Sequence, residues 1–270
     1  MNRLMQWVMA AALICSSTVF TSCSKDDNPV NPADNLAKMI IGKWISTEMD
    51  GRPLMTNSKA VFTFVSATKV YMSTSINKNP GSEFWGDQLE GDVVIDGNKI
   101  TITNKTGEQM TTAIEFIVTA INKYEFFAKR KMTVMVYDKV VFSLDDTVRY
   151  AKVNVDYSEA ILGTWEGHVT NSEGSEYDDG ETHRWEYKAD GTYVYYSQNE
   201  EGEWVPSGDE ISEYFVDGTL LCTRWGNNEQ EFREWWEIVS IKNDVMKWKA
   251  LRQKEDGSTY TATFEMKKVE

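Results

Sequence analysis

The sequence is organised around a four-residue stretch that occurs twice, as Ile41-Gly42-Lys43-Trp44 and as Leu162-Gly163-Thr164-Trp165. The two copies lie 121 residues apart, and each precedes a series of short runs in which apolar and polar residues alternate. Such alternation is typical of β-strands with one buried face. The repeat therefore predicts two β lobes of similar plan within one chain.

Two further landmarks occur at the same spacing. Asp217-Gly218 follows Asp96-Gly97 by 121 residues, and Ile238-Val239 follows Ile117-Val118 by the same distance. Asp-Gly between two apolar runs is a strong signal for a tight β-hairpin. Three landmarks at one spacing indicate an internal duplication better than a single motif would.

Each lobe contains about eight strand-like runs joined by short turns. Such a series predicts an antiparallel up-and-down meander, and closing the meander into a barrel removes both exposed edges. We therefore predict an all-β chain with two tandem eight-stranded antiparallel up-and-down barrels, each preceded by a short helical turn. The predicted first lobe spans residues 34–144 and the second spans residues 158–270, and the weakly patterned residues 145–157 form the linker.

The N-terminal segment has the features of an export signal. Residues 4–20 are mostly apolar, and the run is short for a membrane span. The next residues, Phe20-Thr21-Ser22-Cys23, resemble a bacterial lipobox, although Phe20 stands where the family prefers Leu. This resemblance implies a signal peptide over residues 1–22 and a lipid on Cys23, which would hold the protein to a membrane.

The residues after Cys23 suggest where in the cell the protein is located. Ser24-Lys25-Asp26-Asp27 resembles the signal that sends lipoproteins of the Bacteroidetes type to the outer face of the outer membrane. We therefore expect an outer-membrane, lipid-anchored protein that faces the cell exterior, with residues 23–33 as a proline-containing tether. Retention on the inner leaflet and secretion without lipid stay open as alternatives.

Charge is distributed unevenly along the chain. The formal net charge is −14, from 28 basic and 42 acidic residues. Residues 158–270 contain 25 acidic and 11 basic residues, so the whole excess lies in the second lobe. A chain with this charge is a poor candidate for nucleic-acid binding, because phosphate contacts need clustered Lys and Arg.

An entry turn followed by Gly-x-Trp and about eight strands resembles the lipocalin or calycin plan. The resemblance is greatest to the lipocalin-like domains of bacterial lipoproteins. In that family the glycine permits a close turn and the tryptophan plugs one end of the barrel, which implies these structural roles for Gly42, Trp44, Gly163 and Trp165. The family often binds small apolar molecules inside the barrel, but the sequence leaves open whether these barrels are hollow or filled.

The second lobe is rich in aromatic residues and contains seven of the ten tryptophans. Aromatic planes stack on sugars and on apolar ligands, although core packing explains most of such a set. The neighbours Trp235 and Trp236 must point to opposite faces of their strand. The candidate ligand-binding residues are Trp185, Tyr187, Tyr195, Trp225 and Trp236.

The sequence offers no pattern typical of a catalytic or metal site. His168 and His183 are the only histidines, and Cys222 lies in an apolar run that favours a buried structural thiol. The acidic stretch 173–181 offers oxygen ligands for calcium, but its spacing matches no EF-hand, and a solvated loop is the simpler interpretation. We therefore predict no catalytic residue, no metal and no cofactor.

These observations lead to one main hypothesis and one alternative. The main hypothesis is a non-catalytic cell-envelope lipoprotein that binds a small hydrophobic molecule or a glycan through its lipocalin-like domains, chiefly the second. The alternative is a surface interaction or inhibitor module with plugged barrels that binds a protein partner. An enzyme is disfavoured because no activated nucleophile is evident.

Overall fold

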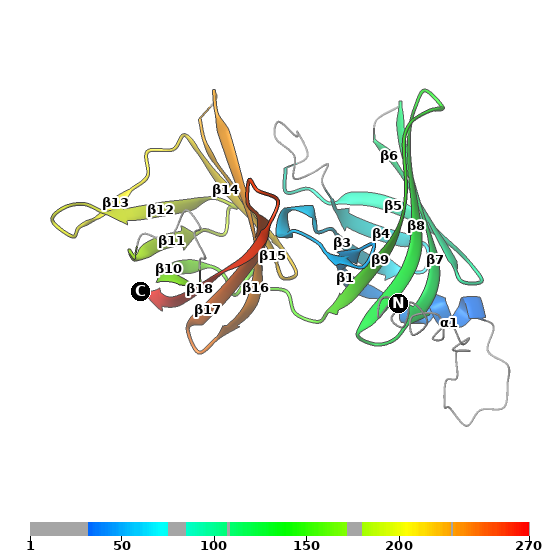
Figure 1. The fold of residues 1–270 in the computed structure, drawn as a ribbon, viewed down its shortest axis with the longest axis horizontal. Coiled ribbons are helices and arrows are strands. Elements are labelled where there is room, and N and C mark those ends of the chain that lie inside the picture. The colour runs from blue at the N-terminus through cyan, green and yellow to red at the C-terminus, as the bar shows by residue number, and fades with distance from the viewer. Residues whose placement is uncertain (1–31, 75–84, 107–108, 172–179, 228, 270) are drawn as a thin grey trace, which may run out of the picture. The chain divides into compact units, whose positions relative to one another are not determined.

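The computed structural model describes residues 32–74, 85–106, 109–171, 180–227 and 229–269, and within them the chain is almost entirely β-sheet (Figure 1). The helical elements in this part of the chain are α1 (Pro32–Met39) and a 3-10 turn, η1 (Thr56–Ser58). None of the helices described is long and apolar enough to span a membrane. The predicted all-β class is confirmed. The predicted signal peptide, Cys23 and residues 23–31 of the tether lie outside the described residues.

The first lobe is a closed antiparallel barrel. Its strands pair in sequence order from β1 and β3 through to β9, and β9 then pairs with β1 and closes the sheet. The predicted eight-stranded up-and-down barrel is therefore confirmed for this lobe, with β2 as a short addition beside β1. The strands are β1 (Gly42–Met49), β2 (Arg52–Pro53), β3 (Val61–Ser66), β4 (Lys69–Ser73), β5 (Leu89–Asp96), β6 (Lys99–Thr106), β7 (Met110–Ile121), β8 (Glu125–Val136) and β9 (Lys139–Val153).

The second lobe is a curled antiparallel sheet of nine strands with β13 and β14 at its two edges. Among the described residues a single isolated bridge, Thr192 with Glu213, joins the two sides. A second closed barrel is therefore not shown, and the prediction holds for this lobe only as a curled half-barrel. The strands are β10 (Gly163–Asn171), β11 (His183–Tyr187), β12 (Tyr193–Gln198), β13 (Trp204–Pro206), β14 (Ile211–Asp217), β15 (Leu220–Gly226), β16 (Glu231–Lys242), β17 (Val245–Gln253) and β18 (Thr259–Val269).

The structure corrects the predicted boundary between the lobes. β9 continues to Val153 and its second half pairs with β1, so most of the predicted linker, residues 145–157, is barrel strand. The apolar alternation is interrupted there because Asp146 lies on the buried face of β9. Its carboxylate accepts a hydrogen bond of 2.9 Å from Nε of Arg130, which compensates for the burial of the charge. At the other end of the lobe, α1 begins inside the predicted tether at Pro32, since proline is well suited to the first position of a helix.

One of the three duplication landmarks is also corrected. The buried residue of β16, Ile238, corresponds to Val118 of β7, because both occupy the same place in the pairing with the next strand. Their separation is 120 residues, since the hairpin that leads into β16 is one residue shorter than its counterpart. A shift of one residue turns each side chain to the other face of a strand. Ile117 and Val239 accordingly lie on the exposed face and are not equivalent to Ile238 and Val118.

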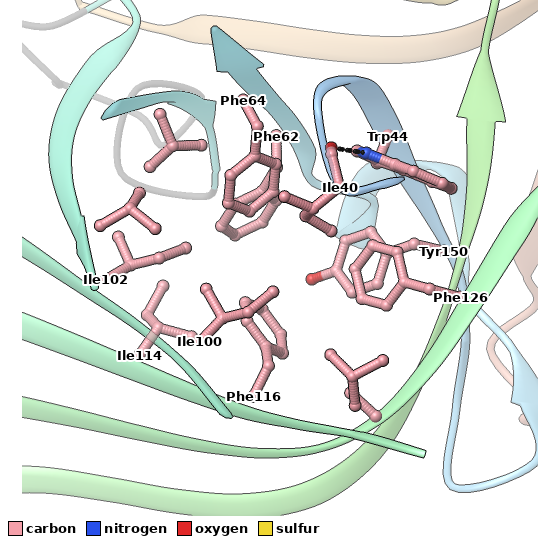
Figure 2. Close-up of a cluster of buried hydrophobic side chains, with 14 of the residues drawn as sticks. Ile40, Trp44, Phe62, Phe64, Ile100, Ile102, Ile114, Phe116, Phe126 and Tyr150 are labelled. Atoms are coloured by element: carbon pink, nitrogen blue, oxygen red, sulfur yellow. Dashed lines mark hydrogen bonds between the residues drawn. The ribbon is translucent and has the colours of Figure 1, made fainter. Parts of the chain in front are cut away.

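The entry segments of the two lobes have the same geometry. Nε1 of Trp44 donates a hydrogen bond of 2.6 Å to the carbonyl oxygen of Ile40 (Figure 2). Nε1 of Trp165 donates one of equal length to the carbonyl oxygen of Ile161. Both indoles are buried in the cores of their lobes, so each one ties its entry turn to the sheet.

The glycine of each Gly-x-Trp motif is required by its backbone conformation, and the end of a flexible lysine side chain lies close to it. Gly42 has φ +117° and Gly163 has φ +111°, a region that residues with a side chain rarely adopt. A Cβ atom at either position would also collide with the side chain of Lys152 or Lys268. The ammonium groups of these lysines lie 4.2 Å and 5.3 Å from the ring centroids of the two tryptophans, within cation–π range.

Aromatic and branched aliphatic side chains converge inside the first barrel (Figure 2). Phe126 stacks on Tyr150 with ring centroids 4.7 Å apart, and Phe62 meets Tyr150 edge-on at 5.5 Å. Phe116 contacts Phe62, Phe126 and Tyr150 at 5.8–6.1 Å. All four rings are at most 2% exposed. This part of the barrel is therefore closely packed.

The two lobes contact each other within one compact unit. A small apolar cluster joins them, with Ile45 and Val61 from the first lobe and Leu220 and Cys222 from the second. Cys222 is fully buried, which confirms the prediction of a buried thiol. Trp235 packs against this cluster, whereas its neighbour points into the core of the second lobe, so the two adjacent tryptophans face opposite sides as predicted.

A buried carboxylate strengthens this contact. Asp217 is 3% exposed and accepts hydrogen bonds from Lys43 at 2.6 Å, from Gln88 at 2.9 Å and from the hydroxyl of Ser73. Burial lowers the pKa of Lys43, but its hydrogen bonds to Asp156 and Asp217 outweigh burial and raise that pKa above 10.5. The first lobe thus supplies three donors to one acceptor of the second.

Candidate ligand-binding site

The candidate site is an aromatic pocket inside the second lobe. The five residues that the sequence suggested for ligand binding, from Trp185 to Trp236, come from four different strands and line this single pocket. Its volume is about 130 Å³. The complete lining is Trp185, Tyr187, Tyr193, Tyr195, Asp209, Thr223, Trp225, Glu234, Trp236 and Trp248.

The pocket lies where the sheet of the second lobe fails to close. In the first lobe, β4 and β5 form a ladder of four residue pairs, from Lys69 with Asp92 to Met72 with Leu89. In the second lobe, the equivalent strands β12 and β14 share only the bridge between Thr192 and Glu213. Both lobes keep the backbone hydrogen bond at the start of the ladder, which in the second lobe joins the Tyr214 N–H to the Gly191 carbonyl at 2.8 Å. Beyond that point the two strands separate.

An additional hairpin explains the separation. β12 continues into a turn and returns as β13, which pairs with residues 196–198. The backbone carbonyl of Tyr195 accepts a hydrogen bond of 2.7 Å from the N–H of Ser207. The edge of β12 that would otherwise bind β14 is therefore occupied by its own hairpin. Without that ladder, the interior of the lobe is open between β12 and β14.

The interior side chains also differ between the lobes at this place. The strand registers make Thr223 equivalent to Ile102 and Glu234 equivalent to Ile114. Both isoleucines are at most 4% exposed and pack in the first core. The second lobe thus has a hydroxyl and a carboxylate where the first has two aliphatic side chains. These polar groups contribute fewer apolar atoms to the core and bring hydrogen-bonding groups into the interior.

Aromatic rings form the base and walls of the pocket. Trp248 lies between Trp185 and Trp236, with ring centroids 5.3 Å and 5.5 Å away. Tyr195 lies 5.2 Å from Trp185 and extends the wall toward the opening. Rings at these separations and tilts support one another in offset or edge contacts. The walls are therefore rigid and present flat apolar faces.

Two hydrogen-bonding groups at the base have no partner among the residues that the structure describes. They are the hydroxyl of Tyr187 and Nε1 of Trp248, and both side chains are 2% exposed. Burial and the nearby charge of Glu234 raise the pKa of Tyr187 well above 10, so this hydroxyl keeps its proton at neutral pH. A buried polar group without a partner costs roughly 1–3 kcal/mol, and a bound ligand that accepts hydrogen bonds would remove that cost.

An ion pair lies at the opening of the pocket. The carboxylate of Glu234 accepts a hydrogen bond from the guanidinium of Arg252, and both side chains are less than 20% exposed. The guanidinium also lies 4.5 Å from the ring centroid of Trp236. The pair therefore holds both planar groups in fixed positions, where they offer several hydrogen bonds to a ligand without an uncompensated charge.

The remaining sequence-based candidates fall outside the pocket. His183 is buried beneath the wall, where Nδ1 lies 2.9 Å from the hydroxyl of Tyr195. His168 lies on the exposed side of β10. Residues 173–179 of the acidic stretch 173–181, which was considered for calcium, lie outside the described residues. Within the described part of the chain, no group of three or more His, Cys, Asp or Glu side chains is placed to hold a metal ion.

Sequence reasoning missed half of the lining. Trp248 stands between two lysines in its strand, and this alternation could have placed it on the inner face. Thr223 and Glu234 gave no such signal, since polar residues in a strand are normally assigned to the exposed face. Only the strand register shows that they point inward.

Comparison with known proteins identifies no family for this chain. No family model and no curated protein matches it. Among solved structures, a protein of unknown function from the DUF3598 family of Nostoc punctiforme is 11% identical over 90% of this chain and 100% of that one, with a TM-score of 0.23. A subtype N11 neuraminidase-like protein of A/flat-faced bat/Peru is 9% identical over 83% and 93% of the two chains, with a TM-score of 0.16. Similarities this low carry no argument about function.

Proposed function

We propose that this protein is a non-catalytic binding protein of the cell envelope whose second lobe holds one ring of a small ligand in the aromatic pocket. The observation that carries the proposal is the pairing of flat aromatic walls with two buried hydrogen-bonding groups that have no described partner. Stacking faces and a few convergent polar groups are the usual composition of a small-molecule site.

The size of the pocket restricts the ligand. A cavity of about 150 Å³ in another protein holds one benzene molecule, so the 130 Å³ found here has room for about one ring. Long acyl chains and haem-like molecules are too large to enter completely. A single sugar ring presents apolar C–H faces for stacking and hydroxyls that accept hydrogen bonds, and it fits both kinds of wall. Of the two ligand classes that the sequence suggested, the pocket therefore favours the glycan.

Binding is tested by titrating the purified chain with glucose, galactose, mannose and N-acetylglucosamine. We expect at least one of them to change the tryptophan fluorescence and to give saturation-transfer signals in NMR, because the pocket contains four tryptophans. Trp225→Leu should weaken that binding about tenfold, which corresponds to roughly 1.4 kcal/mol.

Trp204→Leu is the matched control for this experiment. Trp204 is half-buried in β13, where it stacks with Arg184 outside the pocket, so its loss should leave the affinity unchanged. If none of the four sugars binds, or if the two variants weaken binding equally, the pocket is not the site.

The lipid anchor and the outer-membrane address are part of the same proposal. They are supported by the lipobox-like Phe20-Thr21-Ser22-Cys23 and by the acidic residues that follow it. Cys23→Ala should release the protein from the membrane fraction, because a lipid on this cysteine would supply the membrane affinity. A Cys23→Ala protein that still sediments with membranes would contradict the anchor, and protease treatment of intact cells would test surface exposure.

One observation favours the alternative of a protein partner. The hairpin of β8 and β9 carries four exposed apolar side chains near its tip: Tyr137, Val140, Val141 and Phe142, which are 46–66% exposed. Exposed apolar patches of this kind often mark protein interfaces. Phe142→Lys should then abolish binding of a partner without changing sugar binding in the other lobe, so the two functions can be tested separately.

A further inference from the structure

A second space adjoins the aromatic pocket. This groove has a volume of about 750 Å³ and is lined by β15, β16 and β17 of the second lobe and by residues 55–58 of the first. Two residues, Trp225 and Glu234, line both the pocket and the groove. The pocket and the groove therefore adjoin at these two side chains.

The wall from the first lobe is held in place by direct contacts. The N–H of Leu251 donates a hydrogen bond of 2.8 Å to Oγ1 of Thr56. The ammonium group of Lys59 lies 2.5 Å from a carboxylate oxygen of Glu237, and both side chains are less than 20% exposed. The segment that contains η1 is thus tied to β16 and β17, so it can serve as a fixed side of the site.

The charged side chains that line the groove are all paired with opposite charges. Arg252 binds Glu234, and Arg233 binds Glu231. The remaining polar residues of the lining are neutral amides and hydroxyls: Thr56, Asn57, Ser58 and Gln253. Such a surface offers many hydrogen bonds but no net charge to neutralise, so it suits a neutral ligand rich in hydroxyl groups.

The groove also provides a place for stacking. The rings of Trp225 and Phe232 lie nearly parallel, with centroids 5.8 Å apart and an interplanar angle of 23°. Trp225 is half-buried and Phe232 is 44% exposed. An apolar chain in this groove would remove water from the amides and ion pairs without replacing its hydrogen bonds, at a cost in free energy. A chain of sugar rings can stack on the aromatic faces and also bind these groups.

We infer that the ligand is a neutral oligosaccharide, with its terminal sugar in the aromatic pocket and the following sugars in the groove, where the Thr56–Ser58 turn of the first lobe binds them. The inference rests on the function proposed above and adds the substrate class. It also gives the first lobe a direct part in binding.

The test compares monosaccharides with longer chains on the full protein by isothermal titration calorimetry. Glucose, mannose and N-acetylglucosamine are each titrated beside the β-1,4-linked tetrasaccharide built from the same sugar. In the series that binds, the tetrasaccharide should bind at least about tenfold more tightly than the monosaccharide, because it adds contacts in the groove. If a monosaccharide binds but its tetrasaccharide binds no more tightly, the groove inference is overturned while the pocket stands. If nothing binds in any series, both fail.

A variant in the first lobe locates the additional contacts. Ser58→Trp places a bulky side chain at an exposed position of the groove, and it should remove the tetrasaccharide advantage while the monosaccharide affinity stays the same. Ser143→Trp adds the same side chain at an exposed position of β9 that does not line the groove, and it should have no effect. Circular dichroism verifies that both variants fold. A tetrasaccharide advantage that survives Ser58→Trp would exclude the first lobe from the site.

Discussion

The two lobes share an entry turn and a strand order, yet one closes and the other opens. Both begin with a glycine at positive φ, a buried tryptophan and the same indole-to-carbonyl hydrogen bond. They diverge at the third strand of the shared plan, where β4 pairs with β5 along four residues but β12 pairs instead with its own hairpin. One local change in pairing thus separates a packed barrel from a half-barrel with a pocket.

The interior side chains follow the same division. Where the first sheet closes, Ile102 and Ile114 fill the interior, and where the second sheet opens, Thr223 and Glu234 take their places. An aliphatic core next to an open edge would be exposed to water, whereas a hydroxyl and an ion-paired carboxylate are compatible with it. The comparison shows how one strand order can give a closely packed interior in one lobe and an aromatic pocket in the other.

Among pairs of equivalent residues in the two lobes, the aspartates of the two Asp-Gly turns should differ most in their contribution to the free energy of unfolding. Asp96 is exposed in the first lobe, whereas its counterpart Asp217 is buried and accepts three hydrogen bonds from the other lobe. Asp217→Ala should lower the free energy of unfolding by about 3 kcal/mol, because it removes the buried acceptor of Ser73 and Gln88 and leaves the half-buried Lys43 with Asp156 alone. Asp96→Ala should change it by less than about 0.5 kcal/mol. Urea denaturation followed by circular dichroism measures both, and equal effects would mean that the contact between the lobes adds no stability.

A smaller effect is expected from exchanging the residues that distinguish the interiors. Ile102→Thr should destabilise the protein by about 2 kcal/mol, because it removes buried aliphatic atoms and buries a hydroxyl. Thr223→Ile should instead stabilise it by up to about 1 kcal/mol through added apolar burial, and should block sugar binding by filling the pocket. Calorimetric melting gives the stabilities. If Thr223→Ile destabilises the protein, the hydroxyl of Thr223 is needed for packing. Its presence would then no longer support a different function for the second lobe.

The smallest expected effect is a pH dependence in the second lobe. Burial, together with the charges of Asp190 and Glu159, raises the pKa of Tyr214 from 10.0 to about 12. The folded state holds this proton more tightly than the unfolded state, so the contribution is complete below pH 10 and is lost as the pH rises toward 12. At pH 11 the loss is roughly 1.4 kcal/mol.

Tyr214→Phe isolates that contribution. The variant lacks the ionisable hydroxyl, so its stability deficit relative to the parent should shrink by roughly 1.4 kcal/mol between pH 8 and pH 11. The exposed Tyr124→Phe is the control and should show no such change. Urea denaturation at the two pH values provides the comparison. A constant deficit for Tyr214→Phe would mean that this tyrosine does not ionise on unfolding in that range.

Much of the second lobe could be predicted from sequence, because its strands are short, alternate clearly and end at Asp-Gly turns. The five aromatic candidates do converge on one pocket, since alternate residues of neighbouring strands share a face. The end of the first lobe was harder to predict. Asp146 lies on the buried face beside Arg130, and this ion pair interrupts the alternation that identifies a strand.

The sequence by itself determined the all-β class, the duplication and the glycine-tryptophan entry turns, because these depend on local periodicity and on residues with special backbone freedom. Only the tertiary structure decided which sheet closes, since closure depends on whether β12 pairs with β14 or with its own hairpin. It also decided that Thr223 and Glu234 face inward and that residues 55–58 border the groove. These facts follow from strand register and from contacts between residues far apart in the chain, which local patterns do not encode.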